Sequence, residues 1–270
     1  MKMIRIVFYY IYSVFELLFN VRNWLSLIPI FLKPSSSGDH TIRLRKQPIR
    51  LRLRGAMDVW AVKETFLDAL YTRYGVPVQD GWTVVDIGAG IGDFSIYAAF
   101  DKPDTTVYAF EPFPESYNLL IYNLASNDID NVLPFQEAVW GQSGNLTLDL
   151  SGDEPLQITS RGADVDSKDV DFITVKAITL EDVLHGQVMK RVDLLKLDCE
   201  GAEYDILMKA PSEVLARIDR IVMEYHDVNE ECHHQQLILF LEDAGYQVTH
   251  QRNIVHDEIG YLFAARQDTQ

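Results

Sequence analysis

Residues 84–94 have the sequence VVDIGAGIGDF, which predicts a buried strand, a glycine-rich turn and the start of a helix. Three glycines let the backbone turn sharply and approach a ligand without side-chain obstruction. Taken alone, this pattern also fits a plain strand-to-helix turn. Glu111, however, ends the next apolar run, residues 107–110. A carboxylate at that place accepts hydrogen bonds from a ribose diol, so the two features together predict a nucleoside-like ligand.

Charge is divided unevenly along the 270 residues, whose formal net charge is -16. Residues 1–54 hold 10 of the 24 basic residues and only two of the 40 acidic ones, a balance of +8. Residues 55–270 carry the opposite balance, -24. An acidic body is poorly suited to nucleic acid, because phosphate contacts need clustered lysine and arginine. We therefore expect no nucleic acid partner.

The first 33 residues form an apolar, aromatic N-terminal segment. Arg5, Glu16 and Arg22 interrupt it, so its uncharged runs are shorter than the roughly 20 residues of a spanning helix. Basic residues follow closely, which favours a segment lying in a membrane interface against anionic headgroups. The alternative is a helix packed on the domain or on a partner subunit, so peripheral membrane association and oligomer formation both stay open. Residues 34–53 are interpreted as a basic linker and 54–270 as the main domain.

The two cysteines, Cys199 and Cys232, exclude a disulfide framework and provide no zinc pattern. Their small number is compatible with a reducing compartment. We expect a cytoplasmic protein, located at the inner face of the membrane if the N-terminal segment is interfacial.

Strand-like and helical stretches alternate through the rest of the chain. The expected parallel strands are apolar runs that follow one another between amphipathic helices: 83–87, 106–111, 131–136, 192–198 and 218–225. Buried strands alternating with helices predict an α/β fold with helices on both faces of a mostly parallel sheet. Two final strands without a helix between them predict a C-terminal antiparallel hairpin. This Rossmann-like architecture is that of class I methyltransferases, not of dehydrogenases. The polar stretch 151–172 is expected to be an inserted surface loop.

Three motifs resemble the FkbM family of S-adenosylmethionine-dependent methyltransferases over roughly residues 54–265. They are VDIGAGIG at 85–92, FEP at 110–112 and DLLKLDCEGAE at 193–203, with a further likeness in IVMEYH at 221–226. One departure is Gly90, where family members usually have asparagine. The resemblance implies S-adenosyl-L-methionine as cofactor and O-methylation of a small-molecule or glycan hydroxyl, on a sugar, a glycolipid or a secondary metabolite.

Eight residues are expected to bind the cofactor: Asp86, Gly88, Ala89, Gly90, Glu111, Pro112, Glu137 and Asp198. Asp86 is placed to bond the glycine-loop backbone or, through water, the methionine amine. Glu111 would hold the ribose hydroxyls and Pro112 would pack near the adenine. Glu137 is the weaker candidate for the adenine end. Upstream, Arg54 is a candidate partner of the methionine carboxylate or of a substrate acid.

Asp198, Glu200 and His226 are the candidate catalytic residues, because they cluster at strand tips where open parallel sheets bind ligands. Crowded carboxylates raise one another's pKa, so one of them could act as a base near neutral pH. His226 is the rival base. A second interpretation is that Asp198, Glu200, Glu224 and His226 hold a divalent cation.

Two other functions fit parts of the pattern. The glycine loop and Glu111 alone would suit a nicotinamide-dependent oxidoreductase, and a non-catalytic nucleoside-binding scaffold would keep the same fold. His233 and His234 lie beside acidic residues without partner spacing, and we expect them at the surface.

Overall fold

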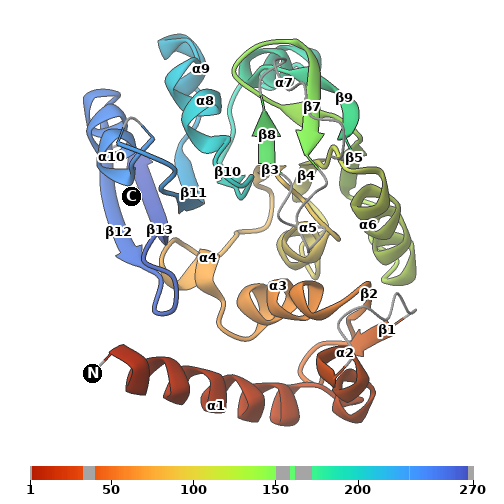
Figure 1. The fold of residues 1–270 in the computed structure, drawn as a ribbon. Helices are drawn as coiled ribbons and strands as arrows, with labels where there is room; N and C mark the ends of the chain where they lie inside the picture. Colours follow the sequence, from red (N-terminus) through yellow and green to blue (C-terminus); the bar gives the residue numbers. More distant parts are fainter. Residues whose placement is uncertain (1, 33–39, 150–158, 162–171, 231, 267–270) are drawn as a thin grey trace.

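A seven-stranded sheet forms the centre of the molecule (Figure 1). The computed structural model describes residues 2–32, 40–149, 159–161, 172–230 and 232–266. The strands of the central sheet follow one another across it in this order: β12 (Tyr246–Arg252), β13 (Ile259–Arg266), β11 (Arg220–His226), β10 (Leu194–Leu197), β3 (Thr83–Ile87), β4 (Thr106–Phe110) and β5 (Val132–Phe135).

The five strands from β11 to β5 are parallel, and β13 pairs antiparallel with both β11 and β12. The chain order across the sheet is that of a parallel α/β core closed by a terminal hairpin, as predicted. The strand β13 is inserted between β11 and β12, so the hairpin extends the sheet instead of lying across it. All five parallel strands direct their carboxyl ends to one edge, where ligands bind in such sheets.

Helices cover both faces of the sheet and bury neighbouring residues of a strand in two different cores. Val84 packs with α3 (Ala56–Phe66), α5 (Asp93–Ala99) and α6 (Pro114–Ser126) in one core. Val85 packs in the other core, whose helices are α7 (Leu180–Gly186), α8 (Glu203–Met208), α9 (Ser212–Leu215) and α10 (His234–Asp243). Because side chains alternate across a strand, this division buries successive strand positions, most of which are apolar.

A second sheet of four strands was not predicted. Its order is β6 (Ala138–Val139), β9 (Phe172–Ile178), β7 (Gly144–Asp149) and β8 (Thr159–Arg161). Part of the expected surface loop at 151–172 therefore pairs as β8, and most of the remainder lies outside the described residues.

The stretch interpreted as a basic linker is a hairpin over its described part, β1 (His40–Arg43) and β2 (Arg50–Leu53). Its apolar side chains alternate with the basic ones and are buried, as in Ile42 and Leu51. The side chains of Asn123 and Asn127 on α6 bond the backbone of β2. The linker prediction was wrong because it weighed the charge of this segment and not its period of two.

Three helical elements precede this hairpin: α1 (Lys2–Asn20), the 3-10 turn η1 (Trp24–Leu27) and α2 (Ile28–Leu32). In Figure 1, α1 runs along the base of the molecule below α3. Among the described residues, α1 alone is long and apolar enough to cross a membrane by length and composition. Its two internal charged residues are both accommodated, because Arg5 is exposed and Glu16 pairs with Lys63 of α3.

Residues 56–73 form two helices, α3 and α4 (Leu70–Arg73). The division falls at Ala69, whose φ of 51° belongs to the left-handed region that an α-helix cannot contain. As a result Tyr71 turns toward the carboxyl edge of the sheet, where its hydroxyl contacts Asp198.

Candidate active site

A cavity of about 510 Å³ opens at the carboxyl edge of the central sheet. Its walls come from the loops after β3, β4 and β10, from the end of β11, from α3, and from Tyr9 and Tyr10 of α1. The small sheet contributes Leu146 and Leu148. A single space therefore joins the glycine-rich turn, the acidic strand tips and the N-terminal helix.

The glycine-rich turn follows β3 with three left-handed glycines. A Cβ on Gly88 would lie 1.8 Å from the backbone oxygen of Asp198, so the turn packs directly on the loop after β10. A Cβ on Gly90 meets nothing within 4 Å. Gly90 lines the cavity, and its backbone is accessible to a ligand there.

Glu111, at the end of β4, is held by two backbone amides. Gly90 N–H donates to Oε2 and Phe113 N–H donates to Oε1, both at 2.8 Å. The residue is buried, and burial raises the pKa of its carboxyl to about 7 in spite of these hydrogen bonds. Each oxygen keeps a second lone pair, so the carboxylate can accept two further hydrogen bonds from a diol in the cavity.

Asp86 pairs with a lysine that was not predicted. Lys196 Nζ lies 3.0 Å from Oδ1 of Asp86 and donates to the Gly88 carbonyl oxygen at 2.8 Å. Burial lowers the pKa of Lys196, but the carboxylates of Asp86 and Asp198 outweigh it and raise that pKa above its usual value. Ser95 donates to the other oxygen of Asp86 at 2.6 Å. Asp86 is fully buried, so it supports the turn from behind.

Asp198 lies in the cavity wall near two other cavity residues, Tyr71 and Glu64, that were not predicted from the sequence. The hydroxyl of Tyr71 donates to its Oδ2 at 2.8 Å. Glu64 of α3 lines the same cavity, and burial together with the charge of Asp198 raises the pKa of Glu64 to about 8. Nothing in the local pattern of α3 or α4 points to these contacts. Lys196, by contrast, had a signal, since it is the one charged residue in the buried run 194–197.

His226, at the end of β11, is surrounded by three carboxylates. The Nδ1 atom of His226 donates to Oε1 of Glu203 at 3.2 Å. Its Nε2 atom lies 3.5 Å from a carboxyl oxygen of Glu200 and 3.8 Å from one of Glu224. Burial lowers the pKa of His226, but the hydrogen bond and charge of Glu203 and the charges of the other two raise it to about 10. The surrounding carboxyl groups therefore favour the protonated imidazole near neutral pH, which argues against His226 as the base.

The carboxylates around His226 have different environments. Burial raises the pKa of Glu200 to about 7, and that of Glu224 well above its usual range. Glu200 has a left-handed backbone, with φ of 51°, and its side chain is 35% exposed. Glu203 is fully buried and also accepts from Cys199 N–H at 3.1 Å. Glu200 is thus the carboxyl group that can exchange a proton with a ligand near neutral pH.

The predicted site residues divide into three groups: those that line the cavity, those behind it, and those whose side chains are paired elsewhere. Those that line the cavity are Gly88, Gly90, Glu111, Pro112, Asp198, Glu200, Glu224 and His226. Asp86 and Ala89 lie behind it and support the turn. Glu137 lies away from the cavity, because its carboxylate pairs with Lys176 on β9. Arg54 is likewise occupied by Asp58 and Ser116.

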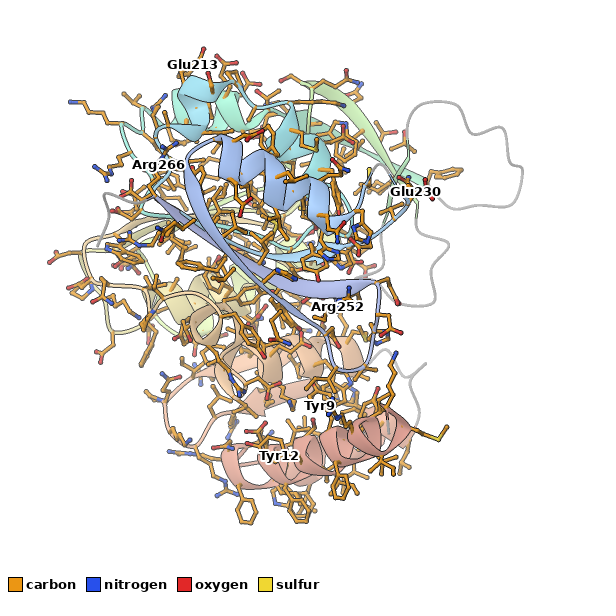
Figure 2. The ribbon with its side chains drawn as sticks, turned by 90° about the vertical axis from the view of Figure 1, so that its left-hand side faces the viewer. Tyr9, Tyr12, Glu213, Glu230, Arg252 and Arg266 are labelled. Carbon is orange, nitrogen blue, oxygen red and sulfur yellow. The ribbon has the colours of Figure 1, made fainter. Side chains whose placement is uncertain are left out.

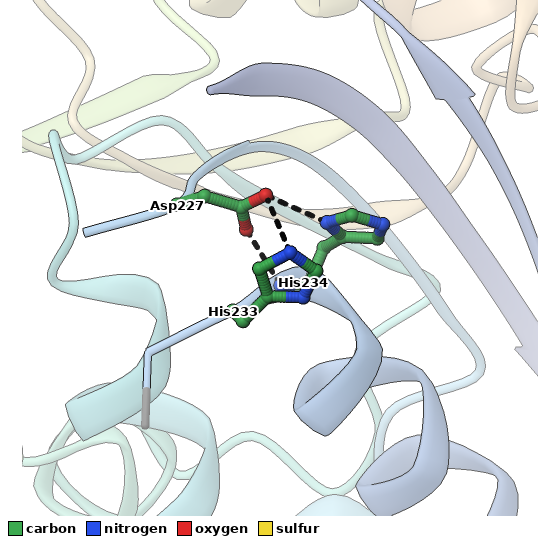
Figure 3. Close-up of side chains that lie close together, drawn as sticks. All are labelled: Asp227, His233 and His234. Carbon is green, nitrogen blue, oxygen red and sulfur yellow. Dashed lines mark hydrogen bonds and ion pairs between the residues drawn. The ribbon is translucent and has the colours of Figure 1, made fainter. Parts of the chain in front are cut away.

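Two groups of described residues bring three ligand-type side chains together within 4.8 Å. One is Asp198, Glu224 and His226 in the cavity, to which Glu200 does not belong. The other is Asp227, His233 and His234, shown in Figure 3.

In this second group, the backbone N–H of His234 donates to Oδ1 of Asp227 at 2.6 Å. The ring Nδ1 of His234 lies 2.7 Å from Oδ2 of Asp227. His234 is buried, contrary to expectation, because Asp227 holds it at the start of α10.

Residues 86–248 match the model of the methyltransferase FkbM domain. The chain is 31% identical over 236 residues to methyltransferase sdnD of Sordaria araneosa, covering 76% of this chain and 89% of that protein.

Two further relatives are more distant. The chain is 28% identical to the 31-O-demethyl-FK506 methyltransferase FkbM of Streptomyces tacrolimicus, covering 69% and 80% of the two chains. It is 25% identical to the hexuronic acid methyltransferase AglP of Haloferax volcanii, covering 52% and 54%.

Proposed function

The chain belongs to the FkbM family of S-adenosylmethionine-dependent methyltransferases, and we propose that it methylates a hydroxyl group of a sugar, a glycolipid or a secondary metabolite. The names of two relatives support this acceptor class, since one names 31-O-demethyl-FK506 and the other a hexuronic acid. The family assignment removes the nicotinamide-dependent and non-catalytic alternatives.

The cavity fits S-adenosylmethionine. Glu111 presents a carboxylate whose two oxygens keep free lone pairs for the ribose hydroxyls, beside Pro112 and Phe113 for the adenine. Asp198 places a carboxylate where the cationic end of the molecule would lie. When bound, the cofactor supplies an electrophilic methyl group on a sulfonium. Gly90 leaves the backbone open on that side.

Glu200 is the base in this proposal. It faces the cavity, its pKa is about 7, and the cationic ring of His226 lies 3.5 Å away. The Glu200 carboxylate would accept the hydroxyl proton of the acceptor, whose oxygen would take the methyl group that S-adenosylmethionine would supply. His226 stabilises the ionised form of Glu200 before transfer, and Asp198 with Tyr71 positions the acceptor.

The observation that carries this proposal is the pair of Glu200 and His226 in the same cavity as Glu111. Labelled S-adenosylmethionine incubated with the protein and extracts of the producing cells tests it. We expect label in a base-stable methyl ether and a loss of at least one hundredfold in Glu200→Gln. Label in an N-methyl or ester product would contradict the hydroxyl assignment. Glu213→Gln, an exposed change on α9, is the control.

The location is a further part of the proposal. We place the enzyme in the cytoplasm, where S-adenosylmethionine is made, and at the inner face of the membrane. Support for the membrane contact comes from the exposed apolar side chains of α1. The acceptor is a small molecule or glycan, and the acidic body disfavours nucleic acid.

A further inference from the structure

The outer face of α1 is apolar and exposed. Side chains project from it away from the rest of the molecule (Figure 2). The largest exposed ones share one broad side of the helix: Met3, Ile4, Val7, Phe8, Ile11, Tyr12, Val14, Phe15 and Phe19. Phe8 is 67% exposed and Phe19 73%. So many exposed apolar side chains on one helix indicate a surface that is covered by something else.

The inner face of α1 is packed on the domain. Ser13 and Leu17 are buried, and the ring of Tyr9 stacks on Trp60 of α3 with centroids 6.5 Å apart. Glu16 pairs with the buried Lys63 at 3.5 Å. A helix held in this way along one side cannot be surrounded by lipid, so it suits the plane of an interface and not a transmembrane position.

The charge of the N-terminal part distinguishes between two candidate partners of the outer face, a second copy of the chain and an anionic lipid surface. The exposed basic side chains of the N-terminal part lie on α1, after it and on the β1–β2 hairpin: Lys2, Arg5, Arg22, Arg43, Arg45, Lys46 and Arg50. A second copy would bring two segments of charge +8 together. Anionic headgroups would instead attract this charge.

The inner face of α1 also forms one end of the cavity. Tyr9 and Tyr10 line it together with Asn253, Val255 and other residues between β12 and β13. Tyr10 is 43% exposed, so the cavity reaches the surface beside the helix. The cavity thus extends from the Glu200 side chain to the edge of the apolar face.

We infer that α1 binds an anionic lipid surface with its outer face, and that the acceptor is a membrane-bound amphiphile whose hydroxyl-bearing head enters the cavity beside Tyr10. The second half of this inference rests on the proposed methyl transfer, and the first half does not. An apolar chain that stays in the lipid needs an enzyme whose cavity opens at the lipid surface, which is the position of Tyr10.

Sedimentation of the full chain with vesicles tests the docking surface. We expect binding to phosphatidylcholine vesicles that contain phosphatidylglycerol, weaker binding to phosphatidylcholine alone, and loss of about tenfold or more in Phe8→Asp/Phe15→Asp. The matched control is Val188→Asp/Leu239→Asp, which changes two exposed apolar residues elsewhere and leaves binding intact. Calorimetric affinity for S-adenosylmethionine, equal in all variants, shows that each is folded.

Two results would overturn docking on lipid. One is equal vesicle binding by the Phe8→Asp/Phe15→Asp variant and the wild type. The other is no vesicle binding at all, together with a wild-type dimer that this variant converts to a monomer, which would assign the face to a second copy.

The acceptor is tested with labelled S-adenosylmethionine and separated membrane and soluble fractions of the producing cells. We expect label in organic-extractable membrane lipid, reduced in Phe8→Asp/Phe15→Asp and restored when detergent disperses the membrane. Label confined to water-soluble products overturns the amphiphilic acceptor. Absence of label in both fractions contradicts the proposed methyl transfer, while the vesicle result still decides the docking.

Discussion

Lys196 of β10 lies opposite Asp86 of β3 in the parallel sheet, with its Nζ 3.0 Å from a carboxylate oxygen of that residue. Both side chains are buried at the centre of the sheet. The same ammonium group donates to the carbonyl oxygen of Gly88. A buried ion pair therefore connects the core of the fold to the turn that faces the cofactor.

Lys196→Met should destabilise the fold by about 3–5 kcal/mol, because it leaves Asp86 as an unpaired buried charge. Urea unfolding measures this. Lys176→Met, which removes an exposed partner of Glu137, is the control and should change stability little. The double variant Asp86→Asn/Lys196→Met should recover part of the loss. A double variant no more stable than Lys196→Met would contradict the pairing.

Gly88→Ala and Gly90→Ala should differ strongly although both glycines have a positive φ. A methyl group at 88 would meet the Asp198 backbone at 1.8 Å, so the turn must move and affinity for S-adenosylmethionine should fall at least tenfold. A methyl group at 90 has space, and the strain of about 1–2 kcal/mol should be the main effect. Calorimetry and urea unfolding together measure both. Equal losses of affinity would contradict the geometry.

Affinity for S-adenosylmethionine should fall below pH 7 because Glu111, whose pKa is about 7, is ionised only above that value. The ionised form accepts hydrogen bonds from the ribose. Titrations at several pH values measure this, and Glu111→Gln should bind weakly with little pH dependence.

The same residue should affect stability in the opposite direction. Its pKa is raised from 4.5 on folding, so it favours the folded protein at low pH and loses that contribution as pH rises through 7. Unfolding free energy should therefore vary less between pH 4.5 and 7 in Glu111→Gln than in the wild type. An unchanged slope in that variant would be the contrary result.

The rate of methyl transfer should rise with pH through about 7 as Glu200 loses its proton. His226→Gln removes the neighbouring positive charge that lowers the pKa of Glu200, so the midpoint of the kcat/KM profile should move upward. His185→Gln, an exposed change on α7, is the control and should leave the midpoint in place. If His226→Gln lowered kcat/KM equally at every pH, His226 would have a structural role only.

Much of the fold follows from local patterns. The five apolar runs, the glycine turn and the final pair of strands each depend on residues close together in the chain, and all were predicted. The hairpin at 40–53 was missed because its apolar and basic residues alternate over only a few positions, and the many basic residues favoured a linker. The small sheet was missed because β7 pairs with β9 across a long insertion.

The sequence by itself determined the strands of the sheet, the cofactor loop and the edge at which Glu111, Asp198 and Glu200 gather, because the apolar runs, the turn residues and the period of burial are local properties. Only the tertiary structure decided which groups touch and which carry a proton. Tyr71 reaches Asp198 across 127 residues, and Glu137 turns away to Lys176. The pKa of His226 is raised because three carboxyl groups surround it, and neither burial nor neighbouring charge is visible until the chain is packed.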